Sequence, residues 1–280
     1  MNMRYLLGWF FALFSVISWA VAEDTSAASP SPSPSPASSP VASGAAAKPA
    51  TWFSINVDGP YIAMTFDDGP SPETTPRLLD ILKQRNIKAT FFMIGQNAER
   101  NPTIVQRILA EGHEIGNHSW THPQLSKLSD DRVTEEINKT QAAIKNASGY
   151  TPVLLRPPYG AITSRQKEWI EKQFGLSVII WSVDPFDWKR PGASVIQQRI
   201  LSGARPGAII LSHDIHKQTV DAMPATLDAL AQKGFKFVTV SQLIAMNKPK
   251  SSATPSPQSG PSASPHTSPA KKHAKLAAGV

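Results

Sequence analysis

The chain has 280 residues, no cysteine and a formal net charge of +7 at pH 7. The lack of cysteine excludes disulfides and lipid attachment through an N-terminal cysteine, so the core must stabilise the fold. Five positive charges lie from Lys248 onward and the first fifty residues are balanced, which leaves +2 for the middle. No basic stripe interleaved with aromatic residues occurs there, which argues against nucleic-acid binding.

Residues 1–22 have the pattern of a secretory signal peptide. Arg4 precedes an apolar run from Tyr5 to Val21, and the small-x-small sequence Ala-Val-Ala ends at Ala22. This pattern predicts cleavage after Ala22 and export to the periplasm, the cell wall or the medium. An uncleaved membrane anchor is the alternative, because the apolar run approaches the length that spans a bilayer.

Two segments of low complexity flank the middle of the chain. Residues 23–51 form a Ser/Pro/Ala-rich linker, and residues 247–280 form a Ser/Pro/Lys-rich tail without acidic residues. Both compositions predict disorder, because they bury too little apolar surface to offset the entropy of ordering. The basic tail could hold the protein near an anionic envelope polymer. A solubilising extension is the other interpretation.

Residues 52–246 have the size of one domain. Apolar runs rich in β-branched and aromatic residues predict seven strands: Tyr61–Phe66, Lys88–Ile94, His113–Gly116, Val153–Arg156, Ser177–Val183, Gly207–Ser212 and Phe235–Val240. The helices between them are indicated by first-turn prolines, an N-cap serine and glycine stops, at Pro76, Pro102, Ser129, Gly149, Gly175 and Gly234.

The alternation of strands and helices predicts an α/β fold with a parallel sheet that helices cover. Seven units fit a single distorted (β/α)7-type barrel better than a short open sheet. In such a barrel, functional residues gather where the strands end and the following loops begin. The polar clusters of this sequence occupy those positions.

The first predicted strand ends in two adjacent carboxylates, Asp67 and Asp68, before a Gly-Pro turn. Side chains alternate in direction along a strand, so one carboxylate could bind a metal while the other accepts a proton. An Asp-Asp-Gly turn by itself also fits an ordinary solvated turn.

Two histidines follow the third predicted strand. His118 and His122 are four residues apart, so on one helical turn they would face the same way. Together with a carboxylate from another strand end they form a ligand set for a divalent metal that activates water or polarises a carbonyl. The same set also fits a non-haem iron oxygenase, so the ligands alone do not name the reaction.

Three further clusters end the fourth, fifth and sixth predicted strands: Arg156 to Gly160, Asp184 to Trp188 and Leu211 to Asp214. A fixed guanidinium can orient a carboxylate, and a histidine near an acid is a candidate proton donor. Taken singly, the arginine or the Asp-Trp pair also fits a structural salt bridge or the wall of a pocket. Five polar clusters at five strand ends indicate a catalytic site.

From Tyr61 to about Ile244 the chain resembles the polysaccharide deacetylase family, the NodB-homology enzymes of carbohydrate esterase family four. Its five motifs occur in order: Thr-Phe-Asp-Asp-Gly, His-x-x-x-His, Arg-x-Pro-Tyr, Asp-x-x-Asp-Trp and Leu-x-His. The resemblance implies that Asp67 is the general base and His213 the general acid. It also implies that Asp68, His118 and His122 are the ligands for Zn²⁺, Co²⁺ or another divalent first-row ion.

The resemblance also assigns supporting roles. It implies that the backbone N–H of Tyr159 stabilises the oxyanion and that Arg156 holds the base. It implies that Asp187 keeps the histidine acid protonated, and that Trp188 and Leu211 wall the pocket for the acetyl methyl group. The role of Asp184, the first aspartate of the Asp-x-x-Asp-Trp motif, stays open.

The implied function is hydrolysis of acetyl groups, foremost the N-acetyl of N-acetylglucosamine, from a cell-envelope or related polysaccharide. The expected partner is an acetylated polysaccharide or oligosaccharide, bound by a monomer. Peptidoglycan, chitin-like oligomers, biofilm polymer and xylan all remain open, because loops shape the groove. The alternatives are a non-catalytic glycan-binding envelope protein and a metal-dependent hydrolase of small amides or imides.

Overall fold

A computed structural model describes residues 50–248 of the chain. The predicted signal peptide, nearly all of the predicted linker and nearly all of the predicted tail lie outside these residues. Within the described part, no helix combines the length and apolarity needed to cross a bilayer.

Eight strands form one sheet in which every pair is parallel. They are β1 (Thr51–Trp52), β2 (Tyr61–Asp67), β3 (Thr90–Met93), β4 (Glu114–Asn117), β5 (Leu154–Leu155), β6 (Ser177–Ile179), β7 (Ile209–Ile210) and β8 (Lys236–Phe237). Their order is β1-β6-β5-β4-β3-β2-β7, and β8 also pairs with β2. The seven predicted strands are confirmed, most of them shorter than expected. Strand β1 was not predicted, because two residues are too few to show a period.

The segment that follows β6 bends the sheet toward a closed barrel. The backbone N–H groups of Ser182 and Val183 donate to the carbonyl oxygen of Ile209 at 3.0 and 3.3 Å, and Leu211 N donates to Val183 O at 2.9 Å. The segment after β6 therefore meets β7, at the other end of the strand order. This confirms a distorted barrel of parallel strands with flanking helices.

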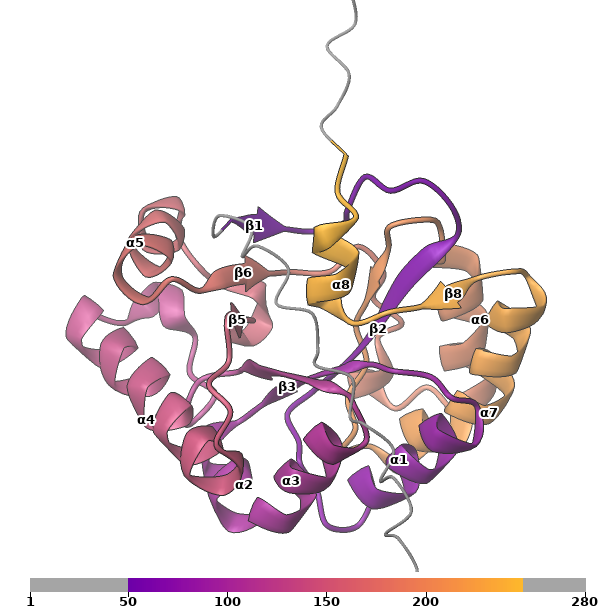
Figure 1. Ribbon diagram of the computed structural model, residues 1–280, viewed down its shortest axis with the longest axis horizontal. Coiled ribbons are helices and arrows are strands. Elements are labelled where there is room, and N and C mark those ends of the chain that lie inside the picture. Colours follow the sequence, from indigo (N-terminus) through magenta and orange to yellow (C-terminus); the bar gives the residue numbers. More distant parts are fainter. Residues whose placement is uncertain (1–49, 249–280) are drawn as a thin grey trace, which may run out of the picture. The chain divides into compact units, whose positions relative to one another are not determined.

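Most of the helices lie in an arc outside the strands (Figure 1). The α-helices are α1 (Thr75–Gln84), α2 (Gly95–Arg100), α3 (Pro102–Ala110), α4 (Asp130–Ser148), α5 (Ser164–Phe174), α6 (Ala193–Gly203), α7 (Lys217–Gln232) and α8 (Val240–Ala245). Three short 3-10 turns are η1 (Leu125–Lys127), η2 (Pro158–Gly160) and η3 (Asp187–Lys189). The predicted punctuation is confirmed at Ser129, whose hydroxyl accepts from Arg132 N, and at Gly149, the left-handed cap of α4.

Strand β2 shows how the sheet separates an outer core from an inner one. Ile62, Met64 and Phe66 belong to the same buried cluster as Leu78 and Leu82 of α1. These alternate residues of β2 therefore point outward against the helices. Burial of each such side chain contributes about 1.5–3 kcal/mol to stability.

The inward-facing residues of β2 change from apolar to polar along the strand. Ala63 packs in a second cluster that includes Phe92 of β3 and Leu243 of α8. Figure 1 shows α8 apart from the outer arc, beside β2 and β8. The next inward residues are Thr65 and Asp67, both buried. The polar end of the barrel interior therefore lies at the carboxyl ends of the strands.

Candidate active site

A buried arginine holds the carboxylate that ends β2. Arg156 is fully buried, and its Nη1 donates to Asp67 Oδ1 and to Thr65 Oγ1, both at 2.7 Å. Its guanidinium lies 4.1 Å from the centre of the Phe92 ring. Burial lowers the pKa of Arg156, while the charge of Asp67 and the hydrogen bond to it oppose that shift. The pair fixes one carboxylate oxygen and leaves Oδ2 facing the site, 3.8 Å from His118 Nε2.

We expect Arg156→Met to lower the free energy of unfolding by about 3–5 kcal/mol, because it leaves the Asp67 carboxylate buried without its counter-ion. Urea denaturation of the metal-free protein measures this. Arg165→Met is the control: Arg165 forms an ion pair with Asp130, but both side chains are exposed, so we expect little change. Equal destabilisation by the two substitutions would contradict the role given to the buried pair.

Asp68 leaves the strand in a left-handed conformation. Its φ is 75°, which is uncommon for a residue other than glycine. Its N–H donates to Phe92 O at 3.1 Å, and its carbonyl accepts from Asn97 Nδ2 at 2.8 Å. The next carbonyl, of Gly69, accepts from Ile94 N at 3.2 Å. Neighbouring β3 and α2 thus hold the turn that places the Asp68 carboxylate beside His118.

Asp214, to which the sequence assigned no role, packs against the same turn. It is fully buried, and its carboxylate accepts a hydrogen bond from Thr75 Oγ1, which itself accepts from Ser71 N. A Cβ atom at Gly69 would come within 2.2 Å of this carboxylate, so only glycine fits there. Burial, partly opposed by the bond from Thr75, raises the pKa of Asp214 to about 7.

Asp68, His118 and His122 come together as a candidate metal site. One ligand atom from each lies within 4.8 Å of the others. Asp68 Oδ1 is 3.4 Å from His118 Nε2 and 3.3 Å from His122 Nε2, and it is buried without a hydrogen-bond partner among the described residues. Burial opposes ionisation of Asp68, but the nearby imidazoles hold its pKa below the usual range.

The tautomer of His118 fits a metal ligand. Its Nδ1 lies 2.7 Å from the main-chain carbonyl of Arg156, which can only accept, so this nitrogen carries the hydrogen. The lone pair of Nε2 then faces the other two ligands. Such an outer hydrogen bond is typical of histidine bound to zinc. The donor set of two imidazoles and one carboxylate fits a divalent first-row cation.

The two histidines converge through a loop, so the expectation of a helical turn is wrong. The segment from His118 to His122 is irregular, and Ser119 and His122 have φ values of 63° and 61°. Two main-chain N–H groups between these residues donate to Glu136 Oε2 at 2.8 Å each. Glu136 is a buried residue of α4. Sequence analysis missed it, because its partners lie about fifteen residues away with no shared period.

His213, which is partly buried, and Asp187, which is fully buried, form a second pair. His213 Nδ1 lies 2.8 Å from Asp187 Oδ1, and His213 N donates to Asp187 Oδ2 at 2.7 Å. Thr219 Oγ1 donates to the same Oδ2 at 2.7 Å. Burial lowers the pKa of His213, but the hydrogen bond and charge of Asp187 outweigh it and raise the pKa to about 9. The histidine therefore keeps its proton at neutral pH, with Nε2 left for another partner.

The remaining predicted site residues differ in exposure. Tyr159 is 68% exposed, with a left-handed φ of 61°, and its ring centre lies 4.7 Å from that of His122. Trp188 is 49% exposed, whereas Leu211 is 3% exposed. Tyr159 and Trp188 can therefore contact a large ligand, while Leu211 lies beneath the surface.

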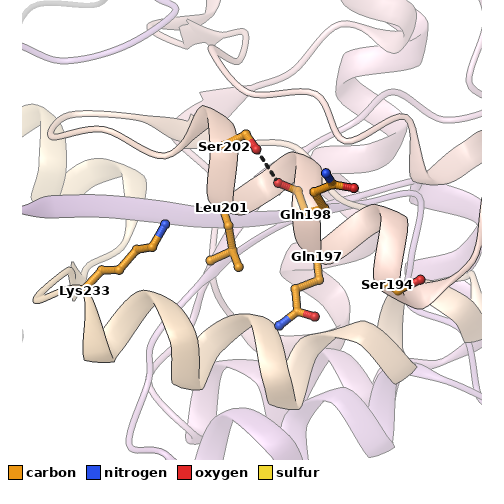
Figure 2. Close-up of a pocket in the computed structure, with 6 residues that line it drawn as sticks. All are labelled: Ser194, Gln197, Gln198, Leu201, Ser202 and Lys233. Atoms are coloured by element: carbon orange, nitrogen blue, oxygen red, sulfur yellow. Dashed lines mark hydrogen bonds between the residues drawn. The ribbon is translucent and has the colours of Figure 1, made fainter.

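A hollow of about 360 Å³ lies elsewhere, on α6 and the end of α7 (Figure 2). Its lining is Ser194, Gln197, Gln198, Leu201, Ser202 and Lys233. The hydroxyl of Ser202 donates to the carbonyl of Gln198 at 2.8 Å, an ordinary bond within a helix. The lining holds no carboxylate and no imidazole, so it offers no ligand set or acid–base pair.

The model of the polysaccharide deacetylase family matches residues 54–179. The peptidoglycan-N-acetylglucosamine deacetylase PgdA of Listeria monocytogenes is 48% identical over 182 residues, which are 65% of this chain and 38% of the relative. The chitooligosaccharide deacetylase of a Bradyrhizobium species is 39% identical over 197 residues, which are 65% of this chain and 90% of the relative.

A solved structure extends the likeness to the fold. The crystal structure of a peptidoglycan N-acetylglucosamine deacetylase matches with a TM-score of 0.67 and 40% identity, over 71% of this chain and 95% of that one. The chain spans well under half the length of the Listeria relative, at 38%. It nevertheless covers nearly all of the solved structure and of the Bradyrhizobium relative. This identity and coverage show that the chain belongs to the polysaccharide deacetylase family, and the site geometry agrees.

Proposed function

We propose that the protein is a divalent-metal-dependent hydrolase that removes N-acetyl groups from an amino-sugar polysaccharide of the bacterial cell envelope. The observation that carries the proposal is the juxtaposition of an Arg-held carboxylate, Asp67, and an Asp-held imidazole, His213, around the candidate ligand trio. Residues 67 and 213 also pair through their backbones, as a parallel β-bridge. The substrate class comes from the relatives, which are deacetylases of peptidoglycan and of chitooligosaccharides.

Asp68, His118 and His122 would hold the cation, with Zn²⁺ and Co²⁺ as the candidates. When bound, a divalent ion lowers the pKa of water and polarises a carbonyl. Asp67 is the base in this proposal, and Oδ2 is the accepting atom because Arg156 already occupies Oδ1. The proton that Oδ2 takes comes from the attacking water.

His213 is the proposed acid. Its Nδ1 is bound to Asp187, so Nε2 gives its proton to the amine nitrogen as the carbon–nitrogen bond breaks. The products are acetate and a free amino sugar. The main-chain N–H of Tyr159 stabilises the oxyanion, and Trp188 and Leu211 receive the acetyl methyl group.

We expect Asp187→Asn to move the alkaline limb of the pH–rate profile to lower pH. The folded-state pKa of His213 is raised from 6.5 to about 9, so its protonated form adds stability below about pH 6.5, and this contribution is lost as pH rises through 9. Without the Asp187 charge, burial, which lowers the pKa, is opposed only by the smaller effects of the Asp67 and Asp68 charges. Nuclear magnetic resonance titration of the metal-free protein reads His213 directly.

Thr219→Val is the control for this experiment, because it removes one hydrogen bond to Asp187 but keeps the carboxylate charge. It should shift the limb much less than Asp187→Asn. An alkaline limb at the same pH in the wild type and in Asp187→Asn would contradict the assignment of His213 as the acid.

Acetate release is the direct test of the function. Chitooligosaccharides, peptidoglycan and acetylated xylan are incubated with the metal-supplied protein, and acetate is quantified while mass spectrometry locates the lost group. Acetate from an amino-sugar polymer supports the proposal. If simple amides or imides assayed alongside are hydrolysed while no glycan releases acetate, the small-amide hydrolase becomes the better interpretation. No acetate release from any glycan would overturn the proposal.

We also propose that the protein is exported; the monomeric state expected from the sequence stays a prediction. The support is the leader pattern of residues 1–22 and the name of the Listeria relative, whose substrate, peptidoglycan, belongs to the cell envelope.

A further inference from the structure

Exposed aromatic side chains gather beside the proposed acid. Among the described residues, five large hydrophobic side chains are exposed: Phe53, Val153, Tyr159, Phe186 and Trp188. Phe186 and Trp188 directly flank Asp187, the partner of His213. Exposed apolar surface next to a site marks a surface for contact with another molecule.

The backbone of the segment that carries Phe186 and Trp188 is strained. Phe186 and Arg190, at the two ends of η3, both have a left-handed φ of 53°. Phe186 N donates to Asp184 Oδ1 at 2.7 Å, and Arg199 Nη1 donates to Pro185 O at 3.0 Å. Such strain in a bulky residue persists only where surrounding contacts impose it, and it is common at ligand-binding sites. Asp184 therefore acts on the shape of the turn.

Lys189 adds a cation to this aromatic surface. Its Nζ lies 5.0 Å from the centre of the Phe186 ring and 4.9 Å from that of Trp188. The two rings are 6.2 Å apart at 67°. Within residues 50–248, Lys189 forms no ion pair with a carboxylate. The rings thus keep the ammonium group at the surface without neutralising it.

The carboxylates close to this surface do not cancel its positive charge. Asp187 is fully buried and accepts from His213 and Thr219, and Asp184 is a single, partly buried carboxylate that attracts Lys189. Arg190 follows directly and is also positively charged. The charge that η3 presents to solvent is therefore positive, and it is complementary to an anionic ligand.

We propose that Phe186, Trp188 and Lys189 form a subsite for a sugar whose substituent carries a carboxylate, next to the sugar that is deacetylated. The inference rests on the proposed function and narrows its substrate class. The rings offer a flat apolar face to the sugar ring, and the ammonium group pairs with the carboxylate. Among glycans with N-acetyl groups, this favours peptidoglycan, whose stem peptides carry free carboxylates, over neutral chitin-like oligomers.

The test compares two substrates in wild type, Lys189→Met and Lys189→Glu. KM is measured for a peptidoglycan oligomer with free carboxylates and for neutral chitotetraose. For Lys189→Met, the ratio of acidic to neutral KM should rise about two- to five-fold, as for one exposed ion pair. Charge reversal should raise it further, and high salt should diminish both effects.

Lys167→Met is the matched control. Lys167 is also a lysine over an exposed ring, 5.6 Å from the centre of Phe53, but it belongs to α5 rather than to η3. The ratio should not change in this variant. The same comparison by calorimetric binding in an Asp67→Asn background measures the subsite without turnover.

The outcomes separate the two proposals. If the wild type releases no acetate from either oligomer, the proposed function fails, and the binding comparison still decides the subsite. If acetate is released but both lysine variants leave the acidic-to-neutral ratio unchanged, the subsite is wrong and the deacetylase activity stands. Equal loss on both substrates likewise overturns the preference for a carboxylate.

Discussion

Asp67→Asn is expected to lower kcat for acetate release by a factor of about 10²–10⁴, the usual contribution of a positioned base. Asparagine has nearly the same shape, and its side-chain oxygen can still accept from Arg156, which donates to Asp67 Oδ1 at 2.7 Å. It cannot take a proton from water. KM and glycan affinity should change little, because the loss falls on the chemical step. Steady-state kinetics and calorimetric binding of the same oligosaccharide measure the two quantities separately.

Asp130→Asn is the control for that variant, because Asp130 is an exposed carboxylate paired with Arg165 at 2.6 Å. It should behave as the wild type in both assays. Thermal melting confirms that each protein is folded. If Asp67→Asn loses affinity as much as turnover, or loses neither, a glycan-binding role without catalysis becomes the better interpretation.

Removing the metal is the second experiment with a large expected effect. Treatment with a chelator should abolish acetate release, and Zn²⁺ or Co²⁺ should restore it. Alanine at Asp68, His118 or His122 removes one of the three proposed ligands, so metal affinity should fall by more than the ~10–100-fold typical of losing an outer partner. Mass-spectrometric metal analysis of the purified variants measures this without relying on activity.

His216→Ala provides the comparison for the ligand variants. The His216 ring lies 5.8 Å from that of His213, yet His216 is outside the group of three whose ligand atoms converge. Its metal content should equal that of the wild type. Normal metal content in all three ligand variants would refute the assignment.

Much of the fold follows from local pattern. The seven predicted strands occur because runs such as Tyr61–Asp67 alternate two buried faces, an outer face against helices and an inner face toward the barrel. Caps such as Ser129 and Gly149 act within one turn of their helix. Signals of this range are readable from a single sequence, because both partners lie a few residues apart.

Other features depend on partners that are distant along the chain. The loop from His118 to His122 is irregular because Glu136 accepts its main-chain N–H groups, which no helical period foretells. Asp214 accepts a hydrogen bond from Thr75, 139 residues away, next to the turn that follows Asp68. Neither contact leaves a periodic trace in the sequence.

The sequence by itself determined which chemical groups this protein has: two adjacent carboxylates, two spaced histidines, and a histidine near an acid, each at a strand end. Only the tertiary structure decided how they are used. Asp67 and Arg156 are 89 residues apart, and their contact leaves one particular oxygen of the carboxylate facing the site. Burial lowers the pKa of His213, but the hydrogen bond and the charge of Asp187, 26 residues away, outweigh it and raise the pKa. Hydrogen-bond geometry and burial arise from packing between distant segments, which local pattern does not encode.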